Sequence, residues 1–129
     1  MKSMKRLFVF FFISIFFFSC QKDKQATIVG LWIEISDCIR DNSGALICGD
    51  APKFPLRLTL SENGEYSFFN DVPAGHGIYQ YNYSNKQLIF ESSGGNVDIR
   101  MVSLLDDDYL IIDYSLNGVV EYRQKFLRY

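Results

Sequence analysis

Cys38 and Cys48 flank a short loop and are the best-placed pair in the chain for covalent chemistry. Between them, Asn42-Ser43-Gly44 predicts a three-residue hairpin loop, with glycine where a left-handed backbone is needed. Counting outward from this loop sets Cys38 opposite Cys48, and directly opposed residues have the Cβ separation that a disulfide requires. We therefore predict a Cys38–Cys48 disulfide. A zinc site is the rival interpretation, but two thiols lack the further ligands that zinc normally takes.

The third cysteine, Cys20, lies at an abrupt change from apolar to charged sequence. Three basic residues precede the apolar run 7–18, which is too short to span a bilayer but suits a signal-peptide core. Ser19, a small residue, comes directly before Cys20. This order resembles the signal of bacterial lipoproteins. The resemblance implies that residues 1–19 are removed and that Cys20 carries a diacylglyceryl group and a further acyl chain such as palmitate.

Acylation at Cys20 implies attachment to a cell-envelope membrane, because each buried methylene contributes about 0.8 kcal/mol. Residues 20–27 then form the lipidated cysteine and its tether, and 28–129 form one domain. Gln21-Lys22-Asp23 is similar in part to signals that send lipoproteins to the cell surface, so we expect the outer membrane, at its periplasmic face or at the surface. The alternatives are an unlipidated secreted protein and an uncleaved anchor.

The charge balance argues against nucleic acid as a partner. The chain has 13 basic and 15 acidic side chains, and removal of residues 1–19 leaves 10 basic residues and a net charge of −5. An acidic domain without a basic run cannot neutralise phosphates. The expected partners are membrane lipid, through acylated Cys20, and either a small apolar ligand or an envelope protein.

Other residue types that support catalysis or metal binding are poorly placed for it. His76 is the only histidine, and we expect it in an exposed turn between two glycines. Asp106-Asp107-Asp108 lacks the spaced ligands of a calcium loop and predicts a solvated turn. Glu62 and Glu65 straddle an Asn-Gly turn and do not form a general acid/base pair. We therefore expect no metal, no cofactor and no catalytic residues.

From residue 28 onward the sequence alternates short β-forming segments with turn signals, and it shows no sustained helical period. Asn63-Gly64 and Asn117-Gly118 are the strongest hairpin signals. About eight strands joined by short turns predict an all-β fold, an antiparallel up-and-down meander closed into a barrel so that no edge is exposed. The expected strands are 28–36, the hairpin around 42–44, 56–60, 65–70, 77–83, 87–92, 96–105, 109–115 and 119–129.

Two short motifs resemble the lipocalin family. Gly30-Leu31-Trp32 at the head of the first strand matches its Gly-x-Trp motif, and Phe126-Leu127-Arg128 lies where the family places an arginine on the last strand. The chain is most similar to the lipocalin-like domains of bacterial lipoproteins. The resemblance implies that an arginine lies across the Trp32 ring and closes the barrel. Arg128 is favoured over Arg123 because it shares a strand face with Phe126.

The same resemblance suggests where a ligand binds. Tyr79 and Tyr81 would point inward, with Tyr66 and Phe68 across the barrel, and the hairpin 38–48 would partly cover the mouth. An eight-stranded barrel is just wide enough to be filled or to hold one small ligand. Two non-enzymatic functions remain open: binding of a small apolar ligand by these aromatic residues, or a filled barrel that interacts with or inhibits another envelope protein.

Overall fold

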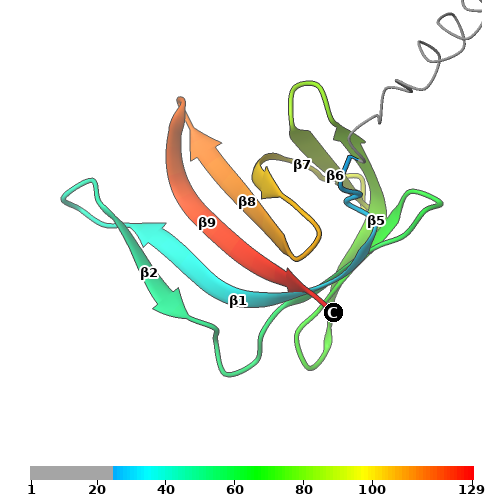
Figure 1. Cartoon of the computed structure of the whole chain (residues 1–129), viewed down its shortest axis with the longest axis horizontal. Helices are drawn as coiled ribbons and strands as arrows, with labels where there is room; N and C mark the ends of the chain where they lie inside the picture. Colours follow the sequence, from blue (N-terminus) through cyan, green and yellow to red (C-terminus); the bar gives the residue numbers. More distant parts are fainter. Residues whose placement is uncertain (1–24) are drawn as a thin grey trace, which may run out of the picture.

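The structure is a computed structural model that describes residues 25–129, and the predicted signal peptide and Cys20 lie outside this range. The described chain is all β (Figure 1), so no helix in it is long and apolar enough to cross a membrane. Its nine strands are β1 (Gly30–Arg40), β2 (Leu46–Asp50), β3 (Arg57–Leu60), β4 (Glu65–Phe69), β5 (Pro73–Asn82), β6 (Gln87–Ser92), β7 (Val97–Leu105), β8 (Tyr109–Leu116) and β9 (Val119–Arg128).

Eight of the strands close into an antiparallel barrel, which confirms the predicted fold class. The order is β1-β3-β4-β5-β6-β7-β8-β9, and β9 pairs back onto β1 to complete the ring. The remaining strand, β2, pairs only with β1 and lies outside the ring, as Figure 1 shows. Closure satisfies the backbone groups that an open sheet would expose, so β2 is the one strand of residues 25–129 that leaves an edge unpaired.

The first strand is longer than the predicted 28–36 segment. β1 continues to Arg40 because β9 supplies a partner along most of its length, from Trp32 opposite Arg128 to Ile39 opposite Tyr122. On its other edge the first half of β1 pairs with β3 and the second half with β2. β1 therefore joins the barrel wall to the disulfide-bearing hairpin without a break.

His76 lies in the middle of β5 rather than in the turn that was predicted, although it is exposed as expected. The two flanking glycines suggested a turn, but Gly77 has a different role. A Cβ at Gly77 would lie 2.0 Å from the carbonyl oxygen of Glu91 on β6. Glycine is thus required there by the close approach of two paired strands, which permits the strand to continue.

The barrel core is filled by buried side chains from seven strands of the ring, and β5 adds the partly buried Tyr79 and Tyr81. Alternate residues point inward, as in Leu58 and Leu60 of β3 and Leu88 and Phe90 of β6. The buried apolar cluster consists of Ile28, Trp32, Leu58, Leu60, Tyr66, Leu88, Phe90, Val102, Leu110, Ile112 and Phe126. Most of these residues lie toward the end that Trp32 closes, which we call the closed end; the opposite end is the mouth.

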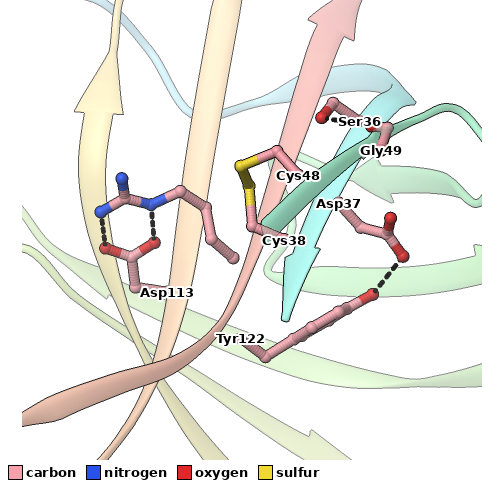
Figure 2. Close-up of a disulfide and its surroundings, with 8 residues drawn as sticks. Ser36, Asp37, Cys38, Cys48, Gly49, Asp113 and Tyr122 are labelled. Atoms are coloured by element: carbon pink, nitrogen blue, oxygen red, sulfur yellow. Dashed lines mark hydrogen bonds and ion pairs between the residues drawn. A yellow bond between two sulfur atoms is a disulfide. The ribbon is translucent and has the colours of Figure 1, made fainter. Parts of the chain in front are cut away.

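The Cys38–Cys48 disulfide is present and has the predicted register (Figure 2). The two cysteines are directly opposed on β1 and β2, with Ile39 opposite Ile47, and their Cα atoms are 3.9 Å apart, slightly closer than the usual 4.4–6.8 Å. Gly44 ends the loop with a φ of 87°, the left-handed value that the sequence predicted. The bond therefore fixes the pairing of β2 with β1.

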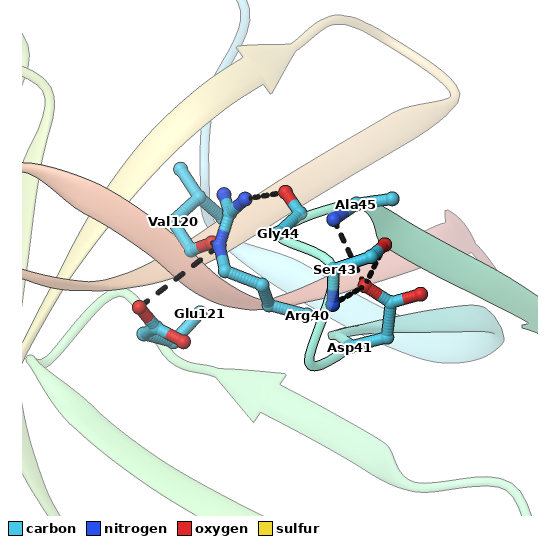
Figure 3. A network of polar contacts seen from close by, with 7 residues as sticks. All are labelled: Arg40, Asp41, Ser43, Gly44, Ala45, Val120 and Glu121. Carbon is cyan, nitrogen blue, oxygen red and sulfur yellow. Dashed lines mark hydrogen bonds and ion pairs between the residues drawn. The ribbon is translucent and has the colours of Figure 1, made fainter.

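The hairpin loop is also held by polar contacts (Figure 3). One carboxylate oxygen of Asp41 accepts hydrogen bonds from the Ser43 hydroxyl at 2.6 Å, the Ser43 backbone N–H at 2.8 Å and the Ala45 N–H at 3.0 Å. The Ser43 hydroxyl bond, followed by that from Ala45, holds the pKa of Asp41 below its ordinary value. Arg40 donates to the carbonyl oxygens of Gly44 and Val120, which ties the loop to β9.

Candidate functional site

The closed end of the barrel is built around Trp32 and Arg128, which are directly paired across β1 and β9. The guanidinium carbon of Arg128 lies 4.1 Å from the centre of the Trp32 ring, the contact that the lipocalin resemblance implies. Trp32 has no exposed surface, and its indole N–H donates to the carbonyl of Ile28 at 2.9 Å. A cation–π contact of this kind contributes roughly 0.5–2 kcal/mol.

Arg128 also binds three backbone carbonyls at the closed end. It donates to Thr27 at 2.7 Å, to Val29 at 2.8 Å and to Asp107 at 2.7 Å. A Cβ at Gly30 would lie 2.7 Å from the Arg128 guanidinium, so glycine in the Gly-x-Trp motif leaves room for the arginine. The planar fork of one arginine therefore joins three segments of chain.

Arg123, the alternative partner for Trp32, has a different role. It forms a two-point contact with Asp113, the residue opposite it on β8, at 2.7 and 2.8 Å. Cys38 is opposite Arg123 on β1, so the ion pair and the disulfide lie on the same outer face of the sheet (Figure 2). Asp113 is only 4% exposed, and its charge is balanced by this contact.

The mouth of the barrel holds a cavity of about 310 Å³. It lies at the low end of the range of about 300–1,000 Å³ that is typical of small-molecule sites. Residues from seven of the eight ring strands, or from the segments next to them, line the cavity. The barrel itself therefore forms the cavity wall. The lining residues are Leu56, Phe68, Ala74, Phe90, Asp98, Arg100, Ile112, Tyr122 and Gln124.

Only one of the four predicted ligand-binding residues, Phe68, lines this cavity. Tyr66 is buried in the core and packs edge-on against Phe68 and Phe90, with ring centres 5.4 and 4.8 Å away. Tyr79 and Tyr81 pack against the core as partly buried residues. The four residues are thus on the inner side of the barrel but do not surround one site.

Tyr79 and Tyr81 belong to the filled part of the barrel. The Tyr79 hydroxyl donates to the carbonyl of Ser61 at 2.8 Å. Tyr81 packs edge-on against Tyr83 at 4.5 Å and borders a smaller hollow of about 250 Å³ at the closed end, which Gln25 also lines. Burial raises the pKa of both Tyr79 and Tyr81, in agreement with a packing role.

The mouth carries polar side chains that the sequence did not single out. Glu34 is 4% exposed and accepts hydrogen bonds from the Gln124 amide at 3.0 Å and from the backbone N–H of Leu56 at 3.2 Å. Asp98 and Arg100 lie two residues apart on β7 and bind each other at 2.8–3.0 Å. Their only sequence signal was their phase: each lies an even number of residues from a buried side chain of its own strand.

The pKa of Tyr122 reflects the electrostatic environment of the mouth. Its hydroxyl donates to Asp37 at 3.4 Å, a long contact drawn in Figure 2. Burial, followed by the negative charges of Glu34 and Asp37, raises the pKa of Tyr122 to about 12. An additional negative charge is therefore disfavoured at this position.

The disulfide hairpin does not form the lid that was expected. None of the residues 38–48 lines the cavity. The hairpin instead extends β1 outward beside the mouth, and Ile39 and Ile47 are each 60% exposed on it. The physical reason is the continuous pairing of β1 with β9, which directs the hairpin along the barrel wall.

A larger hollow, of about 560 Å³, lies on the outer face of the sheet. It is lined mainly by outward-pointing residues of β4, β5 and β6, among them Glu65, Ser67, His76 and Glu91, and the predicted ligand residue Tyr66 also borders it. Within residues 25–129 no three histidine, cysteine, aspartate or glutamate side chains are grouped for metal binding. The mouth cavity is smaller, but it is enclosed by the barrel and is the better candidate for a ligand site.

The acidic run 106–108 forms the turn between β7 and β8. Asp106 accepts hydrogen bonds from the backbone N–H groups of Asp108 and Tyr109 at 2.9 and 2.6 Å. The carbonyls of Asp107 and Asp108 accept from Arg128. This turn therefore contributes to the closed end through its backbone.

No protein-family model and no curated protein matches this sequence. The likeness to lipocalins consequently remains the resemblance carried by the Gly-x-Trp motif and the final arginine. The barrel, the disulfide and the mouth cavity are the observations from which a function can be argued.

Proposed function

We propose that this protein is a lipid-anchored lipoprotein of the cell envelope whose barrel binds a small molecule in its mouth. The observation that carries the proposal is the cavity of about 310 Å³ at the open end of an otherwise filled barrel. Apolar side chains of Phe68, Phe90 and Ile112 form part of its wall and would bury an apolar ligand body. The proposed function is binding without catalysis.

The position of the tether supports an outward-facing mouth. Thr27 and Ile28 lie at the closed end, where Arg128 binds Thr27 and the Tyr83 hydroxyl accepts a hydrogen bond from the Ile28 N–H. Six residues lie between Cys20 and Thr27, so the seven steps from one Cα to the next span at most about 25 Å. A membrane anchor at Cys20 would therefore hold the closed end near the bilayer and leave the mouth accessible.

The anchor is tested by Cys20→Ser. The variant should lose incorporation of labelled fatty acid and should leave the membrane fraction or accumulate as an unprocessed precursor. Cys48→Ser is a control because it removes a thiol without touching the lipidation signal. Retention of both lipid label and membrane fractionation by Cys20→Ser would contradict the lipoprotein assignment.

Ligand binding is tested by native mass spectrometry of the full chain, purified gently from membranes. We expect a co-purifying small molecule that is absent from Ala74→Trp, because Ala74 lines the cavity and is itself exposed, so a large ring there fills the mouth. Ala45→Trp in the hairpin loop is the matched control and should keep the molecule. A bound species retained equally by both variants would place binding elsewhere.

A second candidate is an interaction with another envelope protein through the hairpin. The exposed side chains of Ile39 and Ile47 and the unpaired edge of β2 favour it. Ile47→Asp would abolish such an interaction and leave binding in the mouth unchanged. The two functions can therefore be separated by one substitution.

A further inference from the structure

The mouth cavity is lined by apolar and polar side chains. The apolar ones are Leu56, Phe68, Ala74, Phe90 and Ile112; the polar ones, which we call the polar wall, are Asp98, Arg100, Tyr122 and Gln124. The two kinds adjoin each other, since Asp98 is paired with Phe90 and Gln124 with Ile112. A purely apolar ligand would desolvate the polar wall without replacing its contacts with water. The cavity therefore suits a molecule that has an apolar body and a polar head.

Three side chains of the polar wall each donate a hydrogen bond to a carboxylate, while Arg100 and Gln124 keep further N–H groups. The Gln124 amide donates to Glu34, the Tyr122 hydroxyl to Asp37, and the Arg100 Nε to Asp98. Each acceptor is a carboxylate. The carboxylate, phenol and amide oxygens of this wall also have lone pairs, which match a head group that donates hydrogen bonds.

The charges of this region do not cancel. Arg100 is paired with Asp98, and its guanidinium carbon lies 5.0 Å from the centre of the Tyr114 ring. Glu34 and Asp37 form no ion pair within the described chain, and Glu34 is nearly fully buried. The cavity lining and its direct partners therefore hold three carboxylates and one guanidinium. Glu34 and Asp37 do not line the cavity themselves but accept hydrogen bonds from the neutral side chains of Gln124 and Tyr122, which do.

The pKa of Tyr122 reflects the same two carboxylates. Its phenol lies on the cavity wall, and its pKa is raised first by burial and then by Glu34 and Asp37. Conditions that disfavour a phenolate also disfavour an anionic head group beside it. Burial disfavours a charge of either sign and Arg100 lowers the pKa of Tyr122, so it is only the contribution of the two carboxylates that would attract a positive charge there.

We infer that the ligand bound in the mouth is a cationic amphiphile, an amine or amidine on an apolar body, with its head against Asp98, Tyr122 and Gln124. This inference rests on the proposed ligand-binding function. The apolar body would lie against Phe68, Phe90 and Ile112, and the cation would satisfy the charge of Glu34 and Asp37.

The experiment compares octylamine, octanol and octanoate, which share one chain and differ in head charge, as ligands for the full chain by calorimetry at neutral pH. We expect octylamine to bind about tenfold more tightly than octanol and octanoate to bind most weakly. Equal binding of all three would overturn the cationic inference and leave the binding function standing. Binding of none would overturn both.

Two substitutions distinguish octylamine binding in the cavity from a general attraction of the cation to an acidic protein. Ala74→Trp should remove octylamine binding; unchanged affinity would show adsorption outside the mouth and overturn the inference. Asp98→Asn should release Arg100 and shift the preference at least tenfold toward octanoate. Asp108→Asn makes the same charge change in the turn at the closed end and should leave the order of affinities of the three ligands unaltered. If Asp98→Asn binds the three ligands in the same order of affinity as the unchanged protein, the inference is likewise contradicted.

Discussion

The two ends of this barrel are built by the same pair of strands, β1 and β9, but one end is packed and the other contains a cavity. At the closed end, β1 and β9 bring Trp32 and Arg128 together, and the guanidinium packs against the ring and binds three backbone carbonyls. A few residues further along, the same strands bring together Glu34, Tyr122 and Gln124, which leave a cavity and a surplus of negative charge. The tightest packing is thus concentrated at one end, and the proposed binding site lies at the other.

The contrast follows from the size and polarity of the inward residues. An eight-stranded barrel is just wide enough for side chains to fill its interior. Large apolar residues such as Trp32, Phe126 and Leu58 fill it completely, and each has no exposed surface. Polar residues at the equivalent inward positions of the mouth pair with one another along the wall, so the centre stays open.

Trp32→Ala should have the largest effect on stability. It removes a fully buried ring and the surface on which Arg128 lies, and we expect a loss of about 3–5 kcal/mol. Phe68→Ala at the mouth should cost clearly less, because Phe68 is half-buried beside an existing cavity. The check is chemical denaturation of both variants. Equal losses would contradict the division of the barrel into two unlike ends.

Reduction of the disulfide should have the next largest effect. Closing an 11-residue loop corresponds to about 3 kcal/mol of lost chain entropy in the unfolded state. We expect hydrogen exchange to rise in the hairpin 38–48, where β2 has one partner only, and to change little at the closed end. Cys38→Ala/Cys48→Ala without reductant should reproduce this pattern. Equally faster exchange around Trp32 would show that the hairpin supports the whole barrel.

Arg128→Lys tests the closed end with a smaller change. Lysine keeps the charge but cannot span three carbonyls with a planar fork, so a loss of roughly 1–3 kcal/mol is expected from thermal unfolding. Lys125→Arg is a suitable control, because Lys125 lies over the Tyr109 ring on the outer face. A neutral Arg128→Lys result would mean that its charge alone closes the barrel.

The features predicted from the sequence depend on local patterns. The Cys38–Cys48 register followed from a turn and a count of residues, and the barrel followed from alternation and hairpin signals. The strand face of Arg128 followed from its spacing to Phe126. Each of these inferences needs only neighbouring positions, which is why it survives in the three-dimensional structure.

The mouth could not be predicted in the same way. A polar residue in a strand is normally assigned to the solvent face, so only their spacing from apolar residues of the same strand hinted at the inward positions of Glu34, Asp98 and Gln124. β-Bulges also shift the register, for example between Glu34 and Ser36. The tyrosines 79 and 81 were expected inward and are packed against the core, but the depth at which each strand meets the cavity depends on the stagger of the whole ring.

Tyr122→Phe should have the smallest effect on folding and the most specific effect on pH dependence. The hydroxyl contact to Asp37 is long, at 3.4 Å, so the free energy of unfolding at neutral pH should change by less than about 1 kcal/mol. Because the folded-state pKa is raised to about 12 from 10.0, the folded protein holds this proton where the unfolded chain has lost it. The associated stability is complete below about pH 10 and is lost as the pH rises through 12. An alkaline titration followed by tyrosinate absorbance should lose its latest step in Tyr122→Phe, while Tyr129→Phe, which removes an exposed phenol, should keep that step. If Tyr122→Phe keeps it as well, the negative field assigned to the mouth is absent there, and the contrast between the two ends reduces to packing alone.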